Sequence, residues 1–231
     1  MPDETNIEEN KDHIEAKNKA RRLEETTAEL RERLEATHRA REAALPLARQ
    51  TIQFASRAIR AAHRDERDAA LALTAESKGC VEAVKAALAD HPDLYHAGYV
   101  HDSQKEYVEA AAMLAITAGE ALPGWRELDV EPAAYLNGLA EAASESRRHV
   151  LDKLRLGEVE RAESVLKIMD DIYYELTTFD FPDAITSGLR RTTDSLRAVL
   201  ERTRSDVTLT LSQRRLEMAL REATGKEKNH A

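Results

Sequence analysis

The chain has 231 residues, a formal net charge of −9 and a charged fraction of 33%. This length allows one large domain or two small ones, with enough residues for a substantial core. The negative charge excludes a nucleic-acid surface that is basic throughout, but it leaves room for a local basic face. The single cysteine, Cys80, excludes an intrachain disulfide framework and is typical of a reducing cytoplasm, where we expect the protein to be.

The composition predicts an all-α protein. The chain has only 8 glycines and 6 prolines, whereas Ala, Leu, Glu and Arg are abundant, which is typical of long helices. It lacks an uncharged apolar stretch of about 18 residues, so we expect no membrane span. The polar, acidic start of the chain does not have the pattern of a signal peptide.

We predict one domain with two loose ends: a flexible N-terminus over residues 1–10, a single all-α domain over residues 11–222 and a flexible tail over residues 223–231. The first part of the domain is dense in Glu and Arg, with isolated apolar residues such as Leu30. This pattern favours an exposed helix that is held by ion pairs between residues four apart, or that packs on another subunit. Pro46 is predicted to kink this helix or to restart it.

Downstream of Pro46, apolar residues follow helical spacing in several segments. Residues 45–62 place Leu, Ala and Ile at alternating intervals of three and four, which predicts one buried face. Further helices are predicted at residues 65–90, 103–120, 132–156 and 189–224, and another whose apolar face covers residues 165–176 and which ends before residue 179. We therefore predict an antiparallel bundle of six or seven long helices.

The most apolar of these segments, residues 104–119, contains two glutamates, Glu106 and Glu109. A helix with so few polar residues is expected to be buried on most sides. A carboxylate in such a helix must be paired, protonated or bound to a metal, because an unpaired buried charge is costly. The two glutamates are three residues apart and therefore project from the same face.

A second pair of glutamates, Glu141 and Glu145, lies four residues apart in an alanine-rich segment. Two pairs on two helices could converge on a divalent cation. Mg²⁺ prefers oxygen ligands, and a cation would relieve the repulsion among neighbouring carboxylates. Taken alone, such a pair more often consists of ordinary solvated or salt-bridged helix residues, because pairs at this spacing are common.

Residues 38–64 carry a local excess of positive charge, with six arginines against one acid, Glu42. Two interpretations stay open: a solvated face whose arginine stems cover apolar surface, or a stripe that binds nucleic-acid phosphates. An aromatic fraction of 4% argues against a platform for base stacking. The candidate nucleic-acid-binding residues of this stripe are Arg49, Arg57, Arg60 and Arg64.

Two motifs resemble the translin family. Residues 106–110, Glu-Tyr-Val-Glu-Ala, are similar to a segment of translin-associated factor X, the catalytic partner of translin. Residues 135–138, Tyr-Leu-Asn-Gly, followed by Glu145 and Arg148, resemble a motif of both branches of the family. Weaker similarity is found at residues 47–64, which end in His-Arg, and at residues 157–158 and 189–191. The order and spacing of these motifs agree over roughly residues 38–222.

The resemblance implies a translin-like α-α bundle that assembles with copies of itself into a closed, usually octameric shell with nucleic acid inside. In the factor X branch, which the chain resembles most, two carboxylates on each of two helices form a metal-dependent ribonuclease site. The matching positions, as metal ligands and catalytic residues, are Glu106, Glu109, Glu141 and Glu145. The resemblance also adds Arg148, Arg190 and Arg191 to the nucleic-acid-binding residues. The family has Asp where this chain has Glu141, which changes the reach of that ligand.

We therefore predict a Mg²⁺-dependent endoribonuclease, with Mn²⁺ as the alternative ion, that cuts single-stranded or end-exposed RNA inside a homo-oligomeric shell. Glu109 and Glu141 are the expected inner ligands, while Glu106 and Glu145 complete the cluster or orient the water. Two alternatives stay open. One is a translin-like protein that binds single-stranded RNA or DNA without cutting it, and the other is a helical scaffold that binds no nucleic acid.

Overall fold

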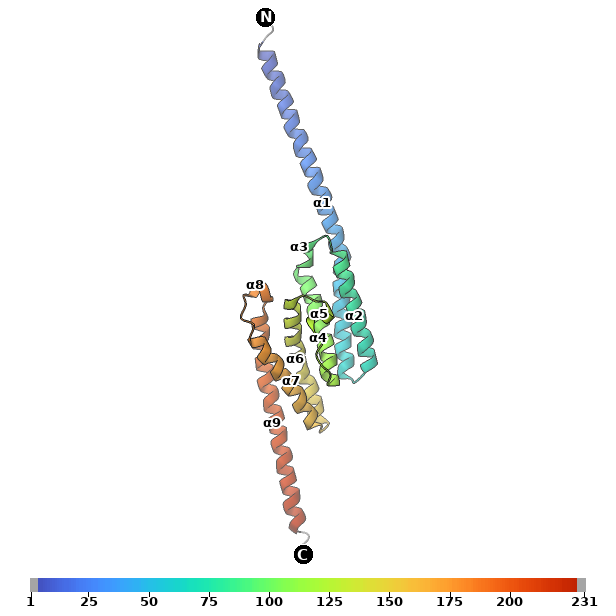
Figure 1. Ribbon diagram of the computed structural model, residues 1–231, viewed down its shortest axis with the longest axis vertical. Helices are drawn as coiled ribbons and strands as arrows, with labels where there is room; N and C mark the ends of the chain where they lie inside the picture. The colour runs from blue at the N-terminus through green and yellow to red at the C-terminus, as the bar shows by residue number, and fades with distance from the viewer. Residues whose placement is uncertain (1–3, 228–231) are drawn as a thin grey trace.

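The computed structural model describes residues 4–227, and over that range the chain forms nine helices and no strand (Figure 1). The long helices are α1 (Glu4–His63), α2 (Arg67–Ala87), α4 (Gly98–Ala118), α6 (Pro132–Arg155), α7 (Val159–Thr177) and α9 (Leu189–Glu227). Short helices in the connections are α3 (Pro92–Tyr95), α5 (Trp125–Leu128) and α8 (Asp183–Thr186). The predicted all-α bundle is confirmed.

Both chain ends that were predicted to be flexible are helical where the structure describes them. Helix α1 includes residues 4–10, and α9 continues through residues 223–227. The other residues of those two ends, 1–3 and 228–231, lie outside the described range.

The long helices pack side by side, with α1 between α2 and α4, and α6 between α4 and the pair α7 and α9 (Figure 1). Helices α4 and α6 therefore occupy the centre of the bundle. The largest apolar cluster joins α1, α4, α6, α7 and α9 through residues such as Met113, Ala143, Met169 and Leu196. Among the described residues, no helix has both the length and the apolar character that crossing a membrane requires.

Helix α4 is buried on most sides, as its sequence predicts. Every residue from 110 to 116 is buried, and the helix lies against α1, α2 and α6. It ends before Gly119, whose φ of +70° is the left-handed conformation that favours glycine at a helix C-terminus. The two glutamates of this helix therefore lie at the edge of a tightly packed apolar surface.

Helices α4 and α6 approach each other closely at Gly138. A Cβ added to this glycine would lie 2.6 Å from the Cβ of Val108 and 2.7 Å from the carbonyl oxygen of Lys105. No side chain larger than hydrogen fits there unless the two helices separate. Since Gly138 is about one turn before Glu141, this contact also fixes how near the acids of α6 come to those of α4.

The prediction that Pro46 restarts the helix is wrong, because α1 runs through it without a break. Proline removes one backbone donor and disturbs the carbonyl four residues earlier, at Glu42. Glu42 and Pro46 are both exposed, so water can hydrate that carbonyl, while Ala44 and Ala48 are buried on the opposite side. The packing of Ala44 and Ala48, before and after the proline, favours continuation of the helix.

Two helical arms project from the bundle in opposite directions, one from the first half of α1 and one from the last part of α9 (Figure 1). The α1 arm is exposed from residue 17 to residue 35, as its sequence predicts. Ion pairs between residues four apart occur there, with Arg21 Nε 3.5 Å from Glu25 Oε1 and Arg39 Nη1 4.0 Å from Glu35 Oε2.

Candidate metal centre

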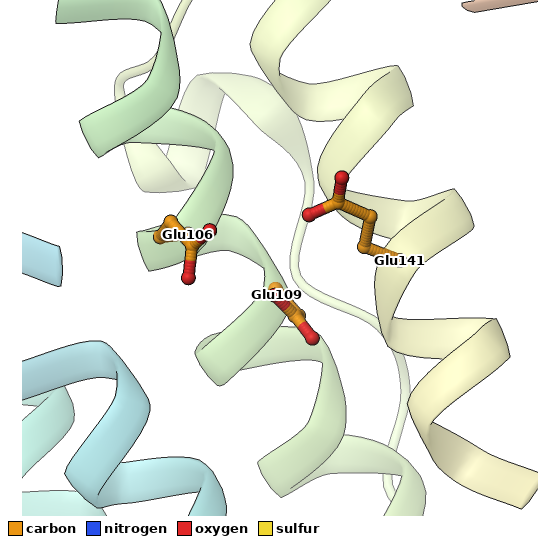
Figure 2. A group of neighbouring side chains, drawn as sticks. All are labelled: Glu106, Glu109 and Glu141. Atoms are coloured by element: carbon orange, nitrogen blue, oxygen red, sulfur yellow. The ribbon is translucent and has the colours of Figure 1, made fainter. Parts of the chain in front are cut away.

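Three carboxylates from two helices meet between α4 and α6. Glu106 and Glu109 extend from α4 and Glu141 extends from α6, and Figure 2 shows the last two facing each other across the gap between the helices. One carboxylate oxygen from each of the three lies within 4.8 Å of the others. All three side chains are half-buried, which places the group at the boundary between core and solvent.

Helix geometry explains why these acids converge. The spacing of three residues puts Glu106 and Glu109 on the same face of α4, and the close contact at Gly138 brings Glu141 opposite them. Beyond Glu109, α4 continues through seven apolar, buried residues, 110–116, so that side of the acids offers no group that could neutralise a negative charge.

Glu109 has the most strongly perturbed carboxyl group of the site. Its pKa is raised from 4.5 to about 8, first by burial and then by the negative charges of Glu106, Glu141 and Glu145, which the positive charge of Lys105 only partly offsets. Burial and the charges of Glu141 and Asp102 also raise the pKa of Glu106, although Lys105 opposes this. The group of acids therefore retains a proton unless more positive charge is supplied.

Lys105 supplies part of that positive charge. Its Nζ donates to Glu141 Oε1 at 2.7 Å and lies 3.8 Å from Glu106 Oε1. Burial lowers the pKa of Lys105, but the hydrogen bond to Glu141 and the surrounding carboxylates outweigh burial and raise it overall. The lysine is thus a permanent cation bound to one side of the acidic group, and it leaves Glu109 without a direct ion-pair partner among the described residues.

Glu145, the fourth predicted acid, lies outside the group of three. His63, at the C-terminal end of α1, donates from Nε2 to Glu145 Oε1 at 2.7 Å. That hydrogen bond lowers the pKa of Glu145, burial opposes it, and the charges of His63 and Arg148 add to the lowering. The His63 side chain is 1% exposed, and its Nδ1 has no hydrogen-bond partner among the described residues.

Comparisons with known proteins agree on one family, although no family model matches the chain. An uncharacterised protein of Methanocaldococcus jannaschii is 31% identical over 169 residues, which are 72% of this chain and 74% of that protein. The structure of AfC3PO with duplex RNA is 36% identical, covers 80% of this chain and 96% of its own, and has a TM-score of 0.76. AfC3PO and NeC3PO are translin-family proteins. This chain belongs to the translin family.

Two more structures extend the comparison. The crystal structure of AfC3PO is also 36% identical, with a TM-score of 0.75, and covers 80% of this chain and 97% of its own. Apo-NeC3PO is 19% identical, covers 78% of this chain and 95% of its own, and has a TM-score of 0.71. At that identity the likeness concerns the fold alone. The AfC3PO structures thus support both the family and the fold, and the NeC3PO structure supports the fold.

Sequence reasoning missed two residues of this translin-family site, Lys105 and His63. A lysine next to a glutamate on a helix is common, so nothing in the sequence distinguishes Lys105 from a solvated residue. His63 carried a weak signal, because it is the histidine of the His-Arg pair in which the resemblance to the first translin helix ends. Its contact with Glu145 spans 82 positions in the sequence and follows only from the packing of α1 near α6.

The residues present fit a small divalent cation. The donors are carboxylate oxygens, which Mg²⁺ and Mn²⁺ prefer, and the raised pKa of Glu109 reflects a repulsion that a cation would remove. Exposed acidic groups also occur commonly without a metal. Two features set this group apart from those: burial and the neighbouring acids raise the pKa of Glu109 to about 8, and Gly138 holds the two helices in close contact.

The predicted nucleic-acid-binding arginines fall on separate parts of the translin-family bundle. Arg49, Arg57 and Arg60 are exposed on α1, and Arg64 is exposed in the turn that follows it. Arg60 donates to Ser56 at 2.8 Å, while Arg64 makes two hydrogen bonds to Glu66, of 2.8 and 2.7 Å, so Glu66 already balances its charge.

The remaining predicted arginines are exposed elsewhere. Arg148 lies on α6, one turn beyond Glu145, whose pKa its charge lowers. Arg190 and Arg191 lie at the start of α9, which is separated from α1 by α4 and α6 (Figure 1). A single chain therefore does not gather all these arginines into one patch.

Proposed function

We propose that this translin-family chain is a metal-dependent endoribonuclease that acts on single-stranded or end-exposed RNA within a homo-oligomeric shell. The observation that carries the proposal is the convergence of Glu106, Glu109 and Glu141 within 4.8 Å, around a carboxyl group whose pKa is about 8. A site built only for stability would pair or solvate that carboxylate.

In this proposal, Glu106, Glu109 and Glu141 hold Mg²⁺ or Mn²⁺. When bound, such an ion supplies a water of lowered pKa and stabilises negative charge on the scissile phosphate. Glu109 would be ionised in the metal-bound protein, and Lys105 would be released from Glu141 to donate to a phosphate oxygen. The ion therefore takes over the positive charge that Lys105 supplies in its absence.

Glu145 is the proposed general base. His63 binds only Oε1, which fixes the side chain and leaves the second oxygen able to accept a proton from the attacking water. The lowered pKa of Glu145 keeps the group ionised near neutral pH, so its second oxygen can accept a hydrogen bond from the attacking water and orient it, although the lowering also weakens Glu145 as a base.

RNA is the proposed substrate because AfC3PO, at 36% identity, has been solved with duplex RNA, and because exposed arginines follow α1 toward the site. Arg57 and Arg60 would contact phosphates without reading the base sequence. Since the relative binds a duplex, the substrate test includes both strand states.

One observation favours the alternative of RNA binding without cleavage. Lys105 already neutralises Glu141, and Glu141 stands where the family has Asp. If the ion cannot displace the lysine, the chain keeps its fold and its phosphate contacts but has no turnover.

The deciding experiment incubates end-labelled single-stranded RNA, duplex RNA and duplex RNA with overhangs with the purified protein in Mg²⁺, Mn²⁺ or EDTA. We expect ion-dependent cleavage that Glu109→Gln abolishes and that Glu163→Gln, an exposed change on α7, leaves intact. Salt-sensitive binding with no cleavage under any ion would establish the non-catalytic alternative. Absence of both binding and cleavage would leave a helical scaffold.

A further inference from the structure

The buried face of α1 continues in register along the exposed arm. Within the bundle, a row of its buried positions follows alternating intervals of four and three: Ala44, Ala48, Thr51, Ala55, Ala58 and Ala62, with Ile59 and Ala61 buried beside this row. Continuing the same intervals toward the N-terminus gives Arg41, Thr37, Leu34, Leu30, Thr27, Leu23 and Ala20. We call residues 20–37 of this series the arm seam.

The leucines of the arm seam are exposed in the single chain. Leu23 is 65% exposed, Leu30 is 53% exposed and Leu34 is 68% exposed. A period of 3.5 residues is that of a two-stranded coiled coil, whereas scattered surface leucines have no such order. A lone helix held by surface ion pairs such as Arg21–Glu25 and Arg39–Glu35 is marginal in water, so an arm of this length requires a packing partner.

Within the described residues, the arm has no partner in its own chain. The contacts of α1 with α2 and α4 lie in the bundle, and the α9 arm points the opposite way (Figure 1). We propose that the arm seam pairs with the arm seam of a second copy of this chain as an antiparallel coiled coil. This proposal does not depend on the nuclease proposal.

Side-chain complementarity selects the antiparallel register. With Leu23 facing Leu34 of the second copy, Thr27 faces Leu30 and the seam closes symmetrically. The same register places Glu24 beside Arg31 of the second copy, twice per pair, flanking the leucines. A parallel pair would instead stack Arg41 on Arg41 at a seam position. It would also bring both bundles to the same end of the coiled coil.

Cysteine cross-linking tests this register directly. In a Cys80→Ser background, Leu23→Cys and Leu34→Cys chains are co-expressed, oxidised mildly and separated without reductant. We expect a cross-linked dimer at least tenfold above that of Leu23→Cys alone. Glu25→Cys with Glu32→Cys, on the opposite face of the arm, is the matched control and is expected to give no cross-link above background.

Charge reversal provides the second measurement. Glu24→Arg opposes like charges at both flanking pairs and is expected to reduce cross-linking at least fivefold, while Glu24→Arg with Arg31→Glu restores it. A strong cross-link through Leu34→Cys alone, whose two copies lie eleven residues apart in the antiparallel register, would mean parallel pairing and overturn the proposal. A yield equal to that of the Glu25 and Glu32 control would do the same, and would assign the seam to a different partner.

Discussion

Glu109 and Lys105 divide the electrostatics of the site between them. One is a carboxyl group that burial and three neighbouring acids keep protonated, and the other is an ammonium group held by Glu141. The negative charges around both residues outnumber the positive ones. Small changes in proton or metal-ion concentration therefore change the protonation of Glu109. Three expectations follow at this scale.

The metal-free protein should lose stability with rising pH through Glu109. The pKa of Glu109 is about 8 in the folded protein and 4.5 in the unfolded chain. Between pH 4.5 and pH 8, folding is therefore accompanied by the uptake of a proton. The stabilisation is complete below pH 4.5 and is lost as pH rises through about 8. Urea unfolding in EDTA should show Glu109→Gln and the natural chain diverging by up to about 1.4 kcal/mol per pH unit, with Gln favoured at high pH. A constant difference across pH would contradict this assignment.

Metal binding should show the opposite pH dependence. Because Glu109 must release its proton to become a ligand, Mn²⁺ affinity should rise about tenfold per pH unit between pH 6 and pH 8. Calorimetry in two buffers of different ionisation enthalpy would measure the released proton. Affinity that does not change with pH would exclude Glu109 from the ligand set.

Lys105→Met should strengthen metal binding. The change keeps the aliphatic stem but removes the cation that holds Glu141, so the affinity for Mn²⁺ should increase by roughly tenfold. If the proposed role of Lys105 at the phosphate is right, cleavage should fall in the same variant. Weaker metal binding would instead show that the lysine positions Glu141 for the ion.

At the scale of the helices, the contact between α4 and α6 at Gly138 sets the site. Gly138→Ala forces a Cβ to within 2.6 Å of Val108, so the helices must separate. We expect a loss of about 1–3 kcal/mol in unfolding free energy, together with weaker Mn²⁺ binding. Gly79→Ala on α2 is the matched control, since nothing lies within 4 Å of its added Cβ and alanine should stabilise that helix by about 0.5–1 kcal/mol. Unchanged metal affinity in Gly138→Ala would show that the close contact of the two helices is not needed for metal binding.

The helices themselves follow from local sequence, whereas their relative register does not. The α6 segment was predicted at residues 132–156 and is observed at Pro132–Arg155, because a proline and a glycine mark its ends. A proline inside a helix usually ends or bends it, which is why a restart was predicted at Pro46. The burial of Ala44 and Ala48 favours a continuous helix there, and this burial is not visible in the sequence. The contact of His63 with Glu145 could not be predicted from the sequence, because it depends on how α1 and α6 are placed in the bundle. Pair spacing placed Glu106 and Glu109 on one face, but only the Gly138 contact brings Glu141 to them.

At the scale of the whole molecule, RNA binding should depend on charge. Arg57→Ala with Arg60→Ala should weaken binding of single-stranded RNA about tenfold at low salt and reduce the slope of affinity against salt. Arg64 is already paired with Glu66, so Arg64→Ala should have less effect and is the comparison within the same stripe. Fluorescence anisotropy over a salt series measures both. Equal affinity for the double variant and the natural chain would remove the stripe from the interface.

Helix α1 is a single unbroken element that ends at His63, beside Glu145, and carries the leucines of the arm far away. At about 1.5 Å per residue, Leu30 and His63 are about 50 Å apart along the same axis. Any shift of the whole helix along its axis would therefore move the imidazole relative to the carboxylate that it holds. One continuous helix thus connects a surface outside the bundle to the histidine that binds Glu145.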